Sequence, residues 1–222
     1  GQPVLNAAPV AECIRQTEAI PLPAEMNQQA DPLLIPGGSG RTATPSKIRR
    51  GIGWGVSIKN LMYSEGFDDF STARCSVTNG IVSLKFATSE VGQGFITLAP
   101  QIARTVLGLD EVYCEPIDTQ IGSAGSTSAS RQTWMSGGAV HGACVRVARQ
   151  ITDSVAKDHN LDPDSLRVDE TNVVDRDGNV IVTMLEATKG RDFSETFEYH
   201  HQQTEDLDEK GQGSCHTAFA FV

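Results

Sequence analysis

The sequence predicts an α+β fold in which a mixed or antiparallel sheet with hairpins is packed by two main helices. The strongest hairpin signal is Asn79-Gly80, which separates two runs of alternating apolar residues. A second turn, at residues 175–178, separates two further strand-like runs. Two longer segments repeat apolar residues every three or four positions, as amphipathic helices do. Such helices and a one-sided sheet bury their apolar faces against each other.

Composition limits the classes of function. A length of 222 residues allows one large or two small domains with a sizeable core. The net charge is −10 and the longest basic stretch is only residues 47–50. This excludes a duplex nucleic-acid binder, because such proteins gain affinity by neutralising phosphates. With no long apolar run and no opening signal peptide, we expect a soluble cytoplasmic protein without a membrane partner.

The cysteines predict neither disulfides nor zinc. They are scattered, odd in number and include no C-x-x-C pair: Cys13, Cys75, Cys114, Cys144 and Cys215. We expect each to be a small buried apolar residue in a reducing compartment.

Residues 1–50 are expected to form a strap or linker, and residues 51–222 the main domain. A short helix is predicted at residues 9–17, with Val10, Cys13, Ile14 and Thr17 on its apolar face. Residues 32–45 indicate a loop that lacks the Gly-Lys-Ser/Thr ending of a P-loop. A strand follows at residues 51–59, with alternate residues Ile52, Trp54, Val56 and Ile58 on one side.

Next come the first hairpin and the two helices. The hairpin strands are residues 72–78 and 81–88, and its expected inward residues are Val77, Ile81, Val82, Leu84 and Phe86. The first helix ends at a Gly108 cap, and Pro100 either lies in its first turn or kinks it, so it is expected to begin near Ala99. A strand is predicted at residues 111–117.

The second helix, at about residues 136–157, has one apolar stripe: Val140, Cys144, Val147, Ile151 and Val155. Its charged residues Arg146, Arg149, Asp153 and Lys157 fall off that stripe and are expected to be solvated. Gly137, Gly138 and Gly142 weaken its start, so we expect close packing there.

The last third predicts a hairpin of residues 166–174 and 179–184, then an acidic loop at residues 195–212. The final apolar run, residues 217–222, has no cap or polar tail, so we expect the domain to continue beyond it. Histidines 200, 201 and 216 with Asp206 and Asp208 match no common metal-ligand spacing, and a solvated loop is the interpretation.

Two turns are candidate ligand sites. Residues 90–94 open the first helix, and residues 122–132, nearly all Gly, Ser, Ala or Thr, precede the second. Both offer backbone N–H groups or hydroxyls without bulk, as a phosphate-bearing ligand requires. The alternatives are an ordinary tight turn and a flexible surface loop. The serines form no G-x-S-x-G elbow, which excludes a serine hydrolase. Trp54 and Trp134 are expected to be core or interface aromatics, with Trp134 a possible pocket wall.

A family resemblance rests on the order of several motifs. They are EVGQG at residues 90–94, a helix and strand, and then DTQIGSAGSTSASRQTWMSGGAV at residues 118–140. Preceded by RRGIGWG and the NG hairpin and followed by HTAFAFV, this order resembles the molybdenum-binding (molybdopterin) domain of the xanthine dehydrogenase and aldehyde oxidase family. The resemblance covers residues 48–222 and implies that family's fold.

The resemblance implies a molybdenum cofactor on a pterin, in some members extended to its cytosine dinucleotide form through a pyrophosphate. It places Gln93, between Gly92 and Gly94, at the hydrogen-bonding edge of the cofactor. It places six residues around the phosphates and the molybdenum-proximal part: Ser128, Ala129, Ser130, Arg131, Gln132 and Thr133. It implies no catalytic residue and no protein ligand to the metal within the chain.

The activity implied is oxidative hydroxylation of a purine, xanthine or hypoxanthine-like, or a related N-heterocycle, with water as the oxygen source. The aldehyde oxidase and carbon monoxide dehydrogenase branches remain alternatives, as does a non-catalytic anion- or nucleotide-binding module. The family's general-base glutamate lies in a GEP-type motif that this sequence lacks. We therefore expect half a cofactor site, inactive and metal-free alone. Its expected partners are the other molybdenum-binding half and Fe–S and flavin domains or subunits.

Overall fold

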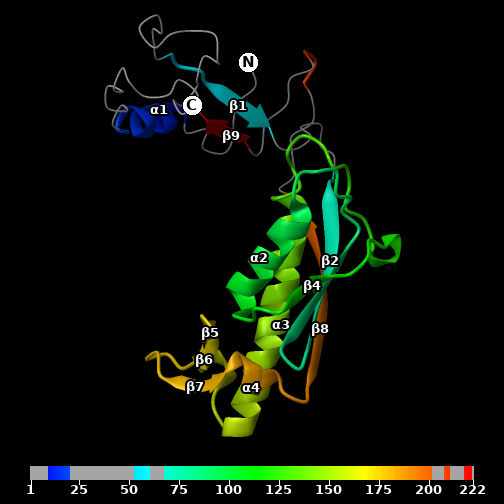
Figure 1. Ribbon diagram of the computed structural model, residues 1–222, viewed down its shortest axis with the longest axis vertical. Helices are drawn as coiled ribbons and strands as arrows, with labels where there is room; N and C mark the ends of the chain where they lie inside the picture. The colour runs from blue at the N-terminus through cyan, green and yellow to red at the C-terminus, as the bar shows by residue number, and fades with distance from the viewer. Residues whose placement is uncertain (1–9, 21–52, 61–67, 202–207, 211–217, 222) are drawn as a thin grey trace, which may run out of the picture. The chain divides into compact units, whose positions relative to one another are not determined.

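The computed structural model describes residues 10–20, 53–60, 68–201, 208–210 and 218–221 (Figure 1). The chain divides into two compact units. The larger unit runs from Asn60 to Thr217 and includes residues 1–5, and the smaller combines residues 6–59 with residues 218–222.

The larger unit is built on a four-stranded sheet in the order β4-β3-β2-β8. The predicted hairpin is confirmed: β2 (Phe70–Thr78) and β3 (Ile81–Phe86) pair antiparallel across Asn79-Gly80. Both turn residues have positive φ, as a two-residue hairpin loop requires. β8 (Asp192–His200) is antiparallel to β2, and β4 (Val112–Cys114) is parallel to β3, so the sheet is mixed.

Two helices, α2 (Phe95–Leu107) and α3 (Met135–His159), lie on one face of this sheet (Figure 1). All five predicted stripe residues of α3 are at most 2% exposed, and its four off-stripe charged residues are exposed, so both predictions are confirmed. The predicted inward residues of the hairpin are buried with one exception. Ile81 is 42% exposed, because the period-two alternation that buries Val82 turns Ile81 to the outer face.

The first main helix begins earlier than predicted. It starts at Phe95 rather than near Ala99, with Pro100 inside it. Proline lacks the N–H that would bond the carbonyl of Ile96, and the Cys114 thiol donates to that carbonyl at 3.8 Å instead. The predicted Gly108 cap is confirmed, with φ 60° and its N–H bonded to the carbonyl of Arg104.

Strand β8 corrects the acidic loop predicted at residues 195–212. Residues 195–200 belong to this strand, whose Phe197 and Tyr199 face α3, and residues 202–207 lie outside the described residues. The rings pack onto the glycines at the start of α3. A Cβ on Gly142 would stand 2.2 Å from the Phe197 ring, and one on Gly138 would stand 2.9 Å from the Tyr199 ring. The close packing predicted there is confirmed.

A small three-stranded antiparallel sheet follows α3 and a short 3₁₀ turn, η3 (Pro163–Ser165). Its strands are β5 (Arg167–Asp169), β6 (Asn172–Val174) and β7 (Val180–Thr183), and α4 (Met184–Thr188) comes next. The hairpin across residues 175–178 is confirmed. Residues 166–174 were expected to be one strand, but Glu170, with φ 49°, turns them into two.

In the smaller unit, α1 (Val10–Glu18) confirms the first predicted helix, and the four residues of its predicted face are its least exposed. β1 (Ser57–Asn60) pairs with β9 (Ala218–Phe221). The strand predicted at residues 51–59 was placed too early, since Trp54 and Val56 precede β1 and are about half exposed. Among the described residues, no helix has the length and apolar character needed to cross a bilayer.

Candidate functional site

The two predicted turns meet at one pocket. A cavity of about 340 Å³ is lined by Val91, Gln93 and residues 127–133. The Thr127 hydroxyl joins the turns by donating to the carbonyl of Ser89 at 3.2 Å. Seven of the nine predicted site residues line the cavity, and Gly92 and Gly94 stand beside it in the first turn. The structure therefore brings together segments that lie about 35 residues apart in the sequence.

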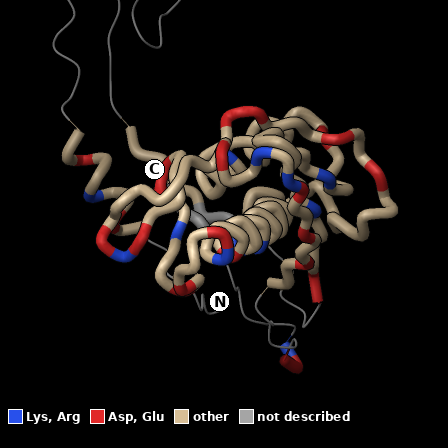
Figure 2. Tube along the Cα trace, turned by 90° about the horizontal axis from the view of Figure 1, so that it is seen from below, with Lys and Arg blue, Asp and Glu red and all other residues tan. Residues whose placement is uncertain are grey.

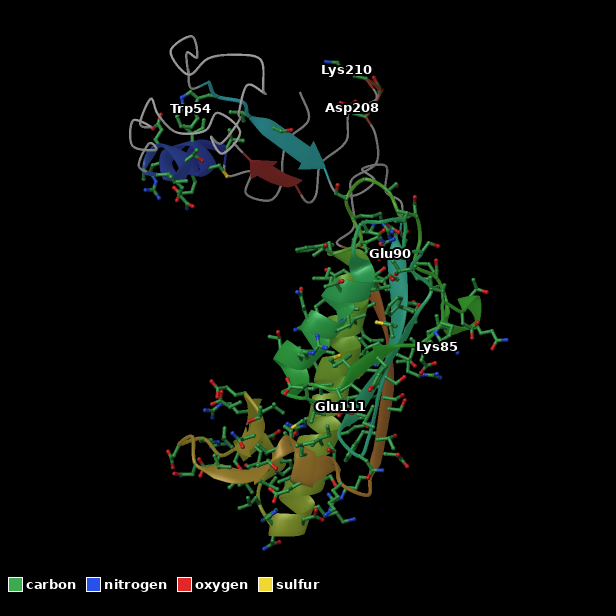
Figure 3. The ribbon with its side chains drawn as sticks, viewed as in Figure 1. Trp54, Lys85, Glu90, Glu111, Asp208 and Lys210 are labelled. Carbon is green, nitrogen blue, oxygen red and sulfur yellow. The ribbon has the colours of Figure 1, made fainter. Side chains whose placement is uncertain are left out.

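The first turn is closed by its own glutamate. The Glu90 carboxylate accepts the N–H groups of Gly92 at 2.9 Å, Gly94 at 2.9 Å and Ile96 at 3.2 Å (Figure 3). These bonds, led by the one from Gly94, hold the pKa of the Glu90 carboxyl below its usual range. The prediction that this turn offers open donors to a phosphate is wrong, because an internal carboxylate already occupies them.

Gln93 lies on the wall of the pocket, and part of its side-chain amide is hydrogen-bonded within the first turn. Its Oε1 accepts the N–H of Val91 at 2.7 Å, and its Nε2 donates to the carbonyl of Ser89 at 2.9 Å. A carboxamide has two N–H donors and two acceptor lone pairs, so one of each remains. Gln93 both shapes the turn and keeps one donor and one acceptor at the exposed wall.

The second turn holds an unusual backbone conformation. Ala129 and Ser130 have φ values of 53° and 55°, two consecutive residues in the left-handed region. Each such residue costs about 1–2 kcal/mol for a side chain other than glycine. Within the described residues, neither N–H group donates to a protein acceptor, and both residues are exposed. Strain of this kind with open donors is typical of ligand-binding loops.

The N-terminus of α3 completes the pocket. Residues 132–134 form a turn, and the first bond of the helix runs from the Met135 N–H to the carbonyl of Arg131. A helix leaves its first N–H groups without internal acceptors, and α3 is 25 residues long. Its dipole therefore favours an anion at Gln132 and Thr133, on the wall of the pocket.

The Arg131 side chain points into the protein. It is fully buried and forms a bidentate ion pair with Asp69, with Nε to Oδ2 at 2.7 Å and Nη2 to Oδ1 at 2.6 Å. Its Nη1 donates to the carbonyls of Ala124 at 2.9 Å and Ser126 at 2.6 Å. The guanidinium therefore braces the loop from behind.

Gln132 is also an internal brace. Its Nε2 donates to the carbonyl of Ser126 at 3.0 Å, and its Oε1 accepts the hydroxyl of Ser136. Ser136 has one hydroxyl hydrogen, so it accepts from both Thr88 at 2.7 Å and Ser71 at 2.9 Å. This buried network links β2, the end of β3 and α3 to the loop. Sequence reasoning missed Asp69, Ser71, Thr88 and Ser136. Asp69 bonds Arg131, and Ser71 and Thr88 bond Ser136, across 48 to 65 residues.

The arrangement suits binding of an anion. The pocket wall supplies backbone N–H groups, hydroxyls and the positive end of a helix, and the neighbouring carboxylates are bonded within the protein, Glu90 to the backbone and Asp69 to Arg131. Among the described residues, no group of three His, Cys, Asp or Glu side chains is placed to hold a metal ion. The Lys and Arg positions are interspersed with Asp and Glu positions (Figure 2).

Comparison with known proteins identifies the family. A family model described as the molybdopterin cofactor-binding domain matches residues 39–222. The chain belongs to this family. The family resemblance and the α+β fold predicted from the sequence are confirmed. A search of curated protein sequences finds no match.

The molybdopterin cofactor-binding domain also resembles solved structures. A Cu,Mo-CO dehydrogenase in its carbon monoxide reduced state matches with a TM-score of 0.51 and 20% identity, over 64% of this chain and 21% of that one. Reconstituted CO dehydrogenase from Oligotropha carboxidovorans gives a TM-score of 0.51 and 20% identity, over 64% and 20%. Quinoline 2-oxidoreductase from Pseudomonas putida 86 gives a TM-score of 0.47 and 16% identity, over 58% of this chain and 19% of that one. The chain spans about a fifth of the length of these structures.

Proposed function

We propose that this domain supplies the phosphate-binding part of the cofactor site in a cytoplasmic molybdenum hydroxylase. The observation that carries the proposal is the pair of left-handed residues, Ala129 and Ser130. Their N–H groups have no protein acceptor among the described residues, and both residues line the same pocket as Gln132 and Thr133 at the entry to α3. A phosphate accepts several charge-assisted hydrogen bonds at once, and this wall offers them without any opposing charge.

The residues divide the work as follows. The N–H groups of Ala129 and Ser130, with the hydroxyls of Ser128, Ser130 and Thr133, bind phosphate oxygens. Gln93 donates and accepts at the polar edge of the pterin with the half of its amide that the turn leaves unused. Arg131 and Gln132 hold the loop in shape from behind. Gly92 and Gly94, with φ values of 98° and 84°, give the first turn its path around Glu90.

When bound, the molybdopterin cofactor would supply oxidative hydroxylation with water as the oxygen source. We propose a purine or a related N-heterocycle as the substrate of the whole protein, and aldehydes or carbon monoxide as the alternatives. The general base would come from outside this chain, since none of the pocket residues is a free carboxylate. The other molybdenum-binding half and Fe–S and flavin domains or subunits are the proposed partners.

The test uses two substitutions at one exposed position of the full-length protein. Ser130→Asp adds a negative charge to the pocket, whereas Ser130→Asn adds a neutral side chain of the same size, and both residues tolerate left-handed backbone. A like charge facing a phosphate costs several kcal/mol, and 1.4 kcal/mol is a tenfold change in affinity. We expect Ser130→Asp to lower the content of molybdenum and of released pterin fluorophore at least about tenfold.

The neutral Ser130→Asn variant should keep most of the molybdenum and most of the released pterin fluorophore. Equal retention by the two variants would contradict a phosphate at this loop. Oxidation of xanthine or hypoxanthine by the wild-type protein supports the substrate proposal, and turnover of only aldehydes or carbon monoxide would replace it with one of the alternatives.

A further inference from the structure

Asp69 stands immediately before β2 and is only 4% exposed. Both of its carboxylate oxygens accept from the fully buried guanidinium of Arg131, at 2.6 and 2.7 Å. A bidentate pair of this kind fixes orientation as well as distance, because two parallel bonds allow neither group to rotate. The main-chain carbonyl of Asp69 also accepts the N–H of His201 at 3.2 Å. The segment that carries Asp69 is therefore held through both its side chain and its backbone.

Arg131, whose guanidinium Asp69 orients, holds the incoming arm of the pocket loop with its side chain and bonds Ser128 with its backbone. Its Nη1 bonds the carbonyls of Ala124 and Ser126 on the incoming arm, and its own backbone N–H bonds the carbonyl of Ser128. Gly125 passes so close that a Cβ there would stand 2.8 Å from Arg131 Nη2 and 2.9 Å from Asp69 Oδ1. The ion pair and the loop therefore fit together without spare room.

The strained residues come directly before Arg131. Ala129 and Ser130 would relax from the left-handed region if nothing held the chain on either side of them. Their N–H groups would then turn away from the pocket. The carbonyl contacts of Arg131 fix the chain before this pair, and its own backbone fixes the chain after it.

We propose that Asp69 is a positioning residue for the cofactor pocket and acts through Arg131. This inference rests on the proposed function, and it assigns a role in cofactor retention to a side chain that does not line the pocket. Asp69 keeps the guanidinium oriented, the guanidinium keeps the loop shaped, and the loop presents the N–H groups of Ala129 and Ser130.

The adjacent Asp68 provides a matched control. It is exposed and pairs with the half-exposed His200 at 2.9 Å, so its change to asparagine removes the same charge one residue away without touching Arg131. Leu107→Ala provides a control for stability, because Leu107 is fully buried at the end of α2 and does not line the pocket.

The experiment measures the rate at which molybdenum leaves the full-length holoprotein, and the thermal unfolding midpoint of each variant. Asp69→Asn should release molybdenum at least about tenfold faster than wild type, because it leaves the buried guanidinium without its counter-charge. The molybdenum release rates of Asp68→Asn and Leu107→Ala should stay within about twofold of the wild-type rate. This should hold even if Leu107→Ala lowers the unfolding midpoint as much as Asp69→Asn does.

The double variant Asp69→Asn with Arg131→Gln separates positioning from stability. Removing both charges relieves the unpaired ion, so the midpoint should recover toward wild type. The release rate should not recover, because the loop still lacks its brace. Recovery of both quantities, or wild-type release from Asp69→Asn, would overturn the inference.

The Ser130→Asp variant distinguishes this failure from failure of the proposed function. If Ser130→Asp loses molybdenum and Asp69→Asn keeps it, the pocket binds the cofactor and only the role of Asp69 is wrong. If Ser130→Asp keeps molybdenum as well, or if the wild-type protein carries none, both proposals are overturned.

Discussion

At the scale of single residues, the pocket combines strained backbone with polar side chains that are already hydrogen-bonded within the protein. Most polar side chains around it are bonded to the protein: Glu90 and Gln93 to their own turn, Arg131 to Asp69, and Gln132 to Ser126 and Ser136. What stays open is the backbone at Ala129 and Ser130, together with the loop hydroxyls and half of the Gln93 amide. The bonded side chains thus define the shape of the pocket, and the open groups are left to meet a ligand.

The strain at Ala129 predicts a stabilising substitution. Ala129→Gly should relieve about 1–2 kcal/mol of left-handed strain and lose about 0.5–1 kcal/mol to the greater freedom of the unfolded chain. We expect a net gain of up to about 1 kcal/mol in the free energy of unfolding, measured in urea. The control Ala139→Gly, inside α3, should lose about 1 kcal/mol. A lower free energy of unfolding in both variants would contradict backbone strain at Ala129.

Glu90 predicts a pH dependence. Its folded-state pKa is lowered by the N–H groups at the start of α2, so its stabilisation is present above the unfolded pKa of about 4.3 and is lost as pH falls through the folded value. Glu90→Gln should therefore lower the unfolding midpoint at pH 7, and the difference from wild type should shrink below about pH 4. A difference that stays constant down to pH 2 would show that the carboxylate does not cap the helix.

Site residues could be predicted from the sequence where their partners lie nearby in the chain. The loop at residues 128–133 and Gln93 could be singled out from the sequence because they lie in two compact motifs, and they line one pocket in the structure. The internal role of Arg131 was not predictable, since its partner Asp69 lies 62 residues away and no pattern marks it. Glu90 could have been interpreted correctly, because a carboxylate four residues before the N-cap of a helix is well placed to accept the N–H groups at the start of that helix.

At the scale of elements, α3 organises the larger unit. It packs on β2 and β8 with one face, on α2 with another, and begins at the pocket. Its periodicity was visible because a long helix under a sheet needs an unbroken apolar stripe. β8 was missed although Phe193, Phe197 and Tyr199 keep the period of a strand. The reason is that polar residues alternate with them, including Glu198 on the solvent face and Glu195 on the aromatic face, and such a polar stretch resembles a loop.

The glycines of α3 predict a contrast between two variants. Gly142→Ala drives a Cβ into the Phe197 ring at 2.2 Å, and overpacking of this kind costs about 1–3 kcal/mol. Gly137→Ala meets the flexible end of Ile102 at 3.3 Å and the Gln132 carbonyl oxygen at 3.7 Å, an ordinary contact. The helix propensity of alanine should therefore make this variant neutral or stabilising by up to about 1 kcal/mol. Denaturant unfolding measures both, and similar values would contradict the packing of β8 on α3.

At the scale of the whole molecule, the fold positions the pocket at one end of the two-layer unit. The start of β2, the end of β3, the entry to α2 and the entry to α3 all contribute to the pocket or to the groups behind it. The family match covers residues 39–222, and the matched part of this chain covers about a fifth of the solved CO dehydrogenase structures. We therefore propose the activity for a larger protein, in which this domain would position the cofactor.

The central claim concerns where the phosphates bind, and one measurement tests it directly. In an electron-density map of the full-length holoprotein, we expect cofactor phosphate oxygens about 2.7–3.2 Å from the N–H nitrogens of Ala129 and Ser130. The Arg131 guanidinium should remain on Asp69, out of contact with the cofactor. Phosphates bound elsewhere, with the Ala129 and Ser130 N–H groups facing water, would contradict the account.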